Sequence, residues 1–359
     1  MKLTVMPPDL PLPDQTAAIL CKELSNWKIE WPDSTPVAQR LNSKNFLLLA
    51  DDIEAAGCSI LWQSDSQDVA KDLLLEATTK DFSTKDFYSW SAKPSILALI
   101  PHWRCDPWLK RCLASLLAQT HPLTNIVVVD DGSAQPPLEI VKNYPTVTLL
   151  RSSDRVGPYQ LIQSVIDKTD YTAYLFQDAD DWSSGDRLKT LLKAARHSGA
   201  ELIGSQEIRV LEPDLTLQSV GYPLDVNQAL AQAPGHGLLH PTSLVTRSLV
   251  QRIGGFATGL RFGGDSEFLL RAQWAARIVN SSRYCYFRRK RPHSLTTAAK
   301  TGLESLARKQ LTDKIKQQAI ARSQSALRQQ RPDLSPLCTE PPVKLTHLWG
   351  PLLRWISSR

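Results

Sequence analysis

Three carboxylates follow an apolar segment near the middle of the chain. Asp178, Asp180 and Asp181 come directly after 172–176, a segment whose composition predicts a buried strand. Negative charges held this close repel one another unless they share a cation. Mg²⁺ and Mn²⁺ are bound by one or two protein carboxylates together with phosphate oxygens. The cluster therefore predicts a divalent-metal site suited to a diphosphate, and an acidic turn before the next helix is the alternative.

A second acidic pair stands at the end of another apolar run. Asp130 and Asp131 follow 125–129 and precede Gly132 and Ser133. Glycine permits close approach of the backbone, and a carboxylate at this place can accept hydrogen bonds from a nucleobase or a ribose. The same four residues also make an ordinary turn, so their place in the fold decides between the two interpretations.

Alternating strand and helix patterns position both acidic groups. We expect strands at 95–100, 125–129, 146–150, 172–176, 201–211 and 283–288, and helices at 106–117, after Gly157-Pro158, from Asp186 to Gly199, at 265–277 and at 302–328. This alternation predicts a parallel sheet covered by helices on both faces. Ligands of such sheets bind at the carboxyl ends of the strands, where both acidic groups would lie.

The ordered set of motifs resembles the family-two inverting glycosyltransferases of GT-A fold over about two hundred residues. The matching pieces are 96–101, 116–120, 127–133, 177–181, 254–256 and 264–271. The resemblance implies an α/β, GT-A-type nucleotide-sugar-binding fold with a mostly parallel sheet flanked by helices. It also implies non-processive transfer of a sugar from a nucleotide-diphosphate sugar to the hydroxyl of a glycan or lipid-linked acceptor, with inversion.

The resemblance assigns roles to individual residues. Asp178 and Asp180 match the Asp-x-Asp pair that holds Mn²⁺ or Mg²⁺ on the donor diphosphate, and His293 matches a position that completes the metal shell in some members. Asp265 matches the general base that takes the proton of the acceptor hydroxyl. A surface histidine and a helix N-cap are the respective alternatives for His293 and Asp265.

Further residues are expected to bind the donor. The resemblance places Pro101, Asp130 and Asp131 at the nucleotide, together with Asp178 at the diphosphate. Arg288, Arg289 and Arg291 lie on or just after a basic strand and could reach the diphosphate, and Arg291 is the one selected. Because a strand turns only every second side chain to one face, at least one of the three is expected to be plain surface.

The chain departs from the family pattern at three places. His102, Trp103 and Arg104 replace the usual residues after the first strand's proline; Arg155-Val156-Gly157, followed by Pro158 and Tyr159, replaces Asn-x-Gly; and Gly264-Asp265 replaces Glu-Asp.

We expect three parts: an accessory α/β region at 1–93, the catalytic domain at 94–300 and a basic helical extension at 301–359. Within the first part, the proline-rich stretch 1–13 is expected to form no regular structure. The segment 283–359 carries 16 basic and 4 acidic residues of a chain whose net charge is +6. We expect the tail 344–359 either to form an interfacial helix on an anionic membrane or to dock on its own domain or on a partner subunit.

The chain has six cysteines but no Cys-x-x-Cys pair, and it contains no apolar run long enough to span a membrane. We therefore expect a cytoplasmic protein. It would contact the inner membrane face only if the tail binds there. Nucleic acid is not an expected partner. A GT-A nucleotidyltransferase and a silent sugar-nucleotide-binding protein are the competing functions. The first normally has a glycine-rich loop after the first strand, which Pro101 to Cys105 do not provide, and the second would not need all of Asp178, Asp180 and Asp265.

Overall fold

The computed structural model describes residues 2–6, 28–30, 59–63, 87–211, 216–292, 294, 296–297, 302 and 304–356. Its strands are β1 Lys2–Met6, β2 Lys28–Glu30, β3 Ser59–Gln63, β4 Ile96–His102, β5 Asn125–Asp131, β6 Val147–Ser152, β7 Ala173–Phe176, β8 Trp182–Ser183, β9 Leu202–Leu211, β10 Thr216–Val220, β11 Leu244–Thr246, β12 Ile278–Lys290 and β13 Leu345–Trp349. Its helices are α4 Asp106–Leu117, α5 Leu138–Val141, α6 Pro158–Lys168, α7 Arg187–Ser198, α8 Val226–Gln232, the 3₁₀ turn η3 His240–Thr242, α9 Arg247–Arg252, α10 Gly264–Ala272 and α11 Leu306–Leu327.

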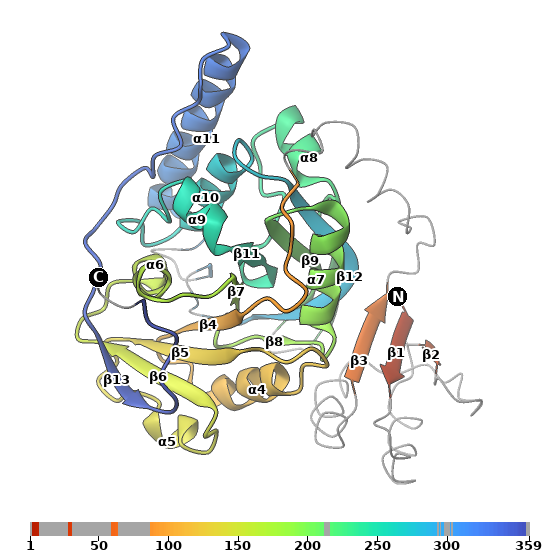
Figure 1. The fold of residues 1–359 in the computed structure, drawn as a ribbon, viewed down its shortest axis with the longest axis vertical. Helices are drawn as coiled ribbons and strands as arrows, with labels where there is room; N and C mark the ends of the chain where they lie inside the picture. Colours follow the sequence, from red (N-terminus) through yellow and green to blue (C-terminus); the bar gives the residue numbers. More distant parts are fainter. Residues whose placement is uncertain are drawn as a thin grey trace.

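One large sheet runs through the molecule (Figure 1). The strands follow the order β13-β6-β5-β4-β7-β11-β9-β12-β3-β1-β2, with β10 beside β9 and β8 beside β12. The neighbours β6, β5, β4 and β7 are parallel, as the sequence predicts. Beyond β7, the short β11 pairs antiparallel with both of its neighbours, so the sheet is mixed instead of mostly parallel.

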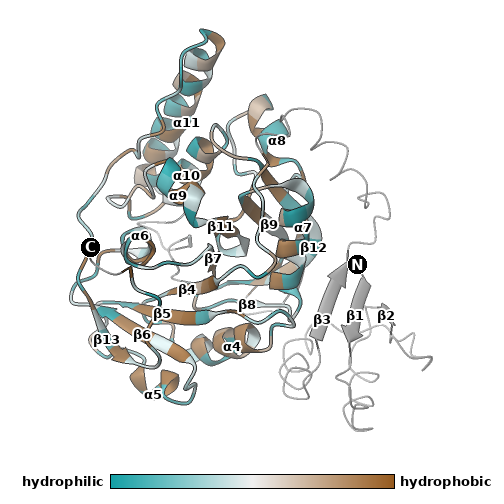
Figure 2. Ribbon diagram, in the orientation of Figure 1, coloured by the Kyte–Doolittle hydropathy of each residue, from teal (hydrophilic) through white to brown (hydrophobic). Residues whose placement is uncertain are grey.

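Alternate side chains of the central strands enter two separate cores. Leu97 and Leu99 of β4 pack with α6 and α10 on one face, whereas Ile96, Ala98 and Ile100 pack with α4 and α7 on the other. This two-sided burial follows from the period of two in a strand, and it explains why these strands are apolar throughout (Figure 2).

The predicted helix boundaries around the sheet are confirmed to within a few residues. Pro107 lies in the first turn of α4, where its missing N–H is tolerated. Gly199 ends α7 in the left-handed conformation, with φ 65°, which glycine adopts without steric cost. Between β9 and β11 the structure also contains β10 and α8, for which no element was predicted.

At the N-terminal end one prediction is wrong, and at the C-terminal end the structure decides between the alternatives. The segment 2–6 forms β1, which pairs with β2 and β3, although it belongs to the proline-rich stretch 1–13 that was expected to form no regular structure. The tail is not a helix, because Leu345–Trp349 forms β13, antiparallel to β6 at the edge of the sheet (Figure 1). Pairing satisfies the backbone groups that an edge strand otherwise exposes. The tail therefore docks on its own domain, and the reason for expecting a membrane-surface helix is removed.

The predicted amphipathic helix of the extension is present as α11, but its buried face is short. Ile315 and Ala319 are buried, whereas Leu306 and Leu327 at the two ends are 71% and 85% exposed. None of the helices in the described ranges is long and apolar enough to cross a membrane.

Candidate active site

A cavity of about 150 Å³ opens beside the carboxyl ends of β4 and β7. Pro101, Asp178 and Asp265 all contribute to its wall. These residues lie far apart in the sequence, and each was selected from its local motif. The fold therefore brings the expected metal ligand and the expected base to one cavity.

Asp265 lies in the first turn of α10, whose N-cap is Gly263, so its carboxylate is not the cap of this helix. Burial by itself would raise the pKa of Asp265, but His236, His240, the Ser266 backbone and the Tyr159 hydroxyl together hold this pKa below its ordinary value. The hydrogen bonds act at every pH, whereas the histidines contribute only when protonated. Asp265 is consequently ionised at neutral pH, as a proton acceptor must be.

The acidic triplet has the composition and spacing of a hard-cation site. One carboxylate oxygen from each of Asp178, Asp180 and Asp181 lies within 4.8 Å of the others. Burial, followed by repulsion from Asp180, raises the pKa of both Asp178 and Asp181. A bound cation would relieve that repulsion, so the residues fit Mg²⁺ or Mn²⁺.

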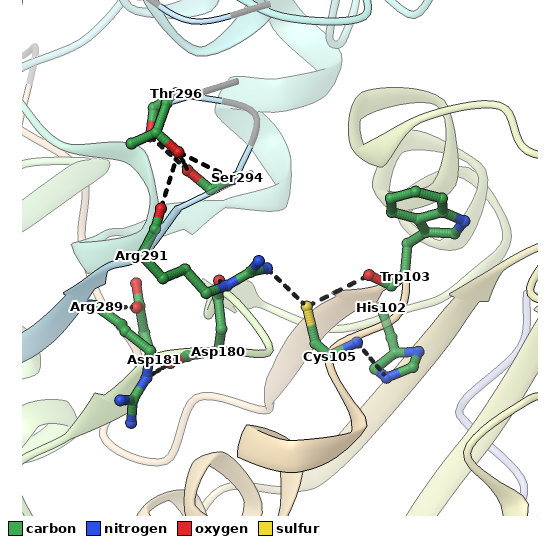
Figure 3. A network of polar contacts seen from close by, with 10 residues as sticks. His102, Trp103, Cys105, Asp180, Asp181, Arg289, Arg291, Ser294 and Thr296 are labelled. Carbon is green, nitrogen blue, oxygen red and sulfur yellow. Dashed lines mark hydrogen bonds and ion pairs between the residues drawn. The ribbon is translucent and has the colours of Figure 1, made fainter. Parts of the chain in front are cut away.

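Arg291 contacts the same cluster (Figure 3). Its Nε donates to Asp180 Oδ2 at 2.8 Å, its Nη2 contacts Cys105 Sγ at 3.6 Å, and its guanidinium lies 4.3 Å from the Trp108 ring centroid. Arg289 donates from its backbone N to Asp181 Oδ1 at 2.7 Å. Arg291 therefore acts here as the counter-charge of Asp180.

Asp130 and Asp131 are already bound within the protein. The fully buried Asp130 accepts from the Ser133 backbone N at 3.0 Å and lies 3.2 Å from His102 Nδ1. The other ring nitrogen of His102 accepts from the Cys105 backbone N at 3.3 Å, so Nδ1 is the protonated nitrogen that donates to Asp130.

The neighbouring Asp131 has different hydrogen-bond partners, which lie at the start of α6. Its carboxylate accepts from the backbone N of Val156 at 2.7 Å and from that of Gly157 at 3.0 Å, directly before α6.

Both aspartates end β5, which is separated from β7 by β4, and strand spacing places the ends of β5 and β7 roughly 10 Å apart. Neither aspartate is part of the cavity wall. Their contact with the nucleotide stays a prediction.

Among the polar side chains of the cavity wall, Tyr159 and His240 were not selected from the sequence, whereas Arg288 is one of the three arginines expected near the diphosphate. Arg288 and Tyr286 lie two positions apart on β12, and the Tyr286 hydroxyl accepts from the Asp178 backbone N at 3.1 Å. Strand periodicity separates the three arginines, since Arg288 shares the Tyr286 face while Arg289 and Arg291 share the other. Tyr159 and His240 carry no local signal. His293 lies outside the described residues.

Part of the chain matches a known protein family. Residues 98–219 match the family described as Glycosyl transferase family 2. This part of the chain is therefore similar to family 2 glycosyltransferases, in agreement with the predicted resemblance, and the structure has the predicted α/β arrangement of a sheet flanked by helices.

Two curated relatives are glycosyltransferases. Glycosyltransferase GlyA of Streptococcus pneumoniae is 29% identical over 101 residues, which are 27% of this chain and 14% of GlyA. The uncharacterized glycosyltransferase EpsJ of Bacillus subtilis is 24% identical over 225 residues, which are 56% of this chain and 63% of EpsJ. The matched part thus spans less than two thirds of either relative.

Among solved structures, S. aureus TarS is similar to this chain. Its complex with UDP-GlcNAc is 20% identical with a TM-score of 0.47, over 56% of this chain and 60% of that chain. Its complex with UDP is 19% identical with a TM-score of 0.46, over 64% of this chain and 72% of that chain.

Proposed function

We propose that this protein is an inverting, metal-dependent and non-processive glycosyltransferase that uses a nucleotide-diphosphate sugar. The observation that carries the proposal is the shared cavity, in whose wall a carboxylate of the acidic triplet stands with the ionised Asp265. A diphosphate-binding site and a proton acceptor are the two elements that transfer to a hydroxyl requires.

The residues of the cavity divide the reaction between them. Asp178 and Asp180 would hold Mn²⁺ or Mg²⁺, which supplies charge stabilisation for the leaving diphosphate. Arg288 adds a permanent positive charge at the same cavity, because Glu207, Asp181 and Asp178 raise its pKa against the opposing effect of burial.

Asp265 is proposed to accept the proton of the acceptor hydroxyl. As that proton leaves, the hydroxyl oxygen bonds to the anomeric carbon of the donor sugar, and the bond from this carbon to the diphosphate breaks on the opposite face. The sugar is thereby transferred with inversion. A glycan or lipid-linked acceptor supplies the hydroxyl, and binding of the whole acceptor rests on surfaces around the cavity.

The test combines binding with turnover. A panel of UDP-, GDP- and dTDP-sugars is titrated calorimetrically with and without Mn²⁺, and release of nucleoside diphosphate is followed. Asp180→Ala is expected to lose Mn²⁺-dependent donor binding, and Asp265→Asn is expected to keep binding but lose turnover.

Asp170→Asn is the matched control, because Asp170 is an exposed carboxylate whose near contact is Arg247 at 3.9 Å. It is expected to behave as the wild type. Uptake of neither Mn²⁺ nor any sugar nucleotide would refute the proposal, and release of pyrophosphate in place of nucleoside diphosphate would indicate nucleotidyl transfer.

A further inference from the structure

Two departures from the family pattern meet in space at the proposed base. Gly264 replaces the acidic neighbour of Asp265, and Tyr159 follows the altered turn before α6. A Cβ atom added to Gly264 would lie 2.8 Å from Cδ2 and 2.9 Å from Cε2 of the Tyr159 ring. Real Cβ atoms do not approach ring carbons this closely, so the Tyr159 ring occupies the space of any side chain at position 264.

The Tyr159 ring is held firmly in this place. Its backbone lies in the first turn of α6, whose start is fixed by the hydrogen bonds from Val156 and Gly157 to Asp131. The buried ring stacks on Phe256 with centroids 6.2 Å apart and planes inclined by 15°. Displacing the ring would therefore disturb its packing against Phe256.

The Tyr159 hydroxyl points at the base. It donates to Asp265 Oδ1 at 3.2 Å. Burial, followed by the negative charge of Asp265, raises the pKa of Tyr159 well above its ordinary value. The hydroxyl consequently keeps its proton and donates at every working pH, and the bond stabilises the ionised form of Asp265.

We propose that Tyr159 is the positioning residue of Asp265, and that position 264 must be glycine because the Tyr159 ring takes the space of its side chain. The proposal rests on the base role given to Asp265 above. In this chain a tyrosine from α6 therefore orients the base, at the place where the family pattern has an acidic neighbour on α10.

Other charged groups also face Asp265, and they bear on its protonation. They are His236 and His240 before β11, Asp178 after β7, Arg261 before α10, Arg288 on β12 and Arg308 on α11. A substitution at Tyr159 leaves all of them in place, so the change in pH dependence isolates one hydrogen bond.

The first test is the pH profile of Tyr159→Phe, which keeps the ring and removes the hydroxyl. With the donor that binds best in the sugar-nucleotide panel, we expect the donor KM to change less than twofold and kcat to fall about tenfold. The acid limb of the kcat profile should move upward by about one pH unit, which corresponds to a tenfold change in the protonation of Asp265.

Tyr171→Phe is the control, since Tyr171 is buried but donates to Asn125 Oδ1 at 2.8 Å, away from the cavity. Its profile should match the wild type. If Asp265→Asn retains turnover, the base assignment itself is wrong. If Asp265→Asn is inactive while Tyr159→Phe keeps the wild-type pH profile, only the role of Tyr159 is refuted.

The second test uses urea unfolding and needs no activity. Alanine in a helix is ordinarily more favourable than glycine, so a lower unfolding midpoint for Gly264→Ala would report the clash with Tyr159. Combining Gly264→Ala with Tyr159→Leu should destabilise less than the sum of the single changes, because the smaller side chain leaves space. Additive effects would overturn the steric part of the proposal.

Discussion

Arg291→Gln is expected to strengthen the binding of Mn²⁺ to the protein alone. The ion pair between Arg291 Nε and Asp180 Oδ2 is 2.8 Å long, with the two side chains 17% and 18% exposed. A cation that uses this oxygen must displace the guanidinium. A hydrogen bond between charged groups contributes about 1.5 to 3 kcal/mol, and each 1.4 kcal/mol is a factor of about ten in affinity.

Because the pair is partly solvated, the lower end of that range applies, and we expect a roughly tenfold lower Kd for Mn²⁺ in Arg291→Gln. The donor should bind more weakly to the same variant, since Arg291 is then no longer available to the diphosphate. Calorimetric titration with MnCl₂, and with donor at saturating Mn²⁺, measures both effects.

Arg283→Gln is the control, because it removes the same charge beside Asp186, at a distance of 3.9 Å from that carboxylate. If Arg291→Gln binds Mn²⁺ no more tightly than Arg283→Gln does, then Arg291 does not compete with the cation, and the prediction is refuted.

Three further predictions concern stability. Burial lowers the pKa of His240 from 6.5 to about 4. As the pH falls, the His240 side chain is therefore protonated in the unfolded chain before it is protonated in the folded protein. The free energy of unfolding should consequently fall by about 3 kcal/mol as the pH drops from above 6.5 to 4. Urea unfolding across this range should show a smaller loss for His240→Gln, and an equal loss would exclude His240 as the source. Arg187→Met should cost about 3 kcal/mol or more in the same assay, because the buried guanidinium donates to Gln177, Ser183 and the carbonyls of Phe176 and Pro241; an unchanged midpoint would contradict this. Gly350→Ala should release β13 from β6, since the φ angle of Gly350 is 84° and an added Cβ would lie 2.0 Å from the Val147 carbonyl oxygen. If the β13 amides of the variant are protected from hydrogen exchange as well as those of the wild type, this prediction is disproved.

Much of the central fold follows from local patterns. The strands β4 to β7 and the helices α4, α6 and α7 were predicted because apolar periodicity, proline at helix starts and glycine at helix ends act within a few residues. The tail was left open between a membrane-surface helix and docking because 345–356 contains apolar residues compatible with more than one structure. The edge of β6, about 200 residues earlier, selected the strand.

For the site, the sequence by itself selected the side chains that we propose to carry the chemistry: the acidic triplet after β7 and Asp265, since strand ends and helix starts are marked locally. Only the tertiary structure decided which carboxylates are open to a ligand and which are bound internally. Asp131 is bound by backbone amides 25 and 26 residues away, and Asp265 receives a hydroxyl from 106 residues away. Hydrogen bonds and close contacts act over a few ångströms in space, whatever the separation along the chain, so no local pattern encodes these partners.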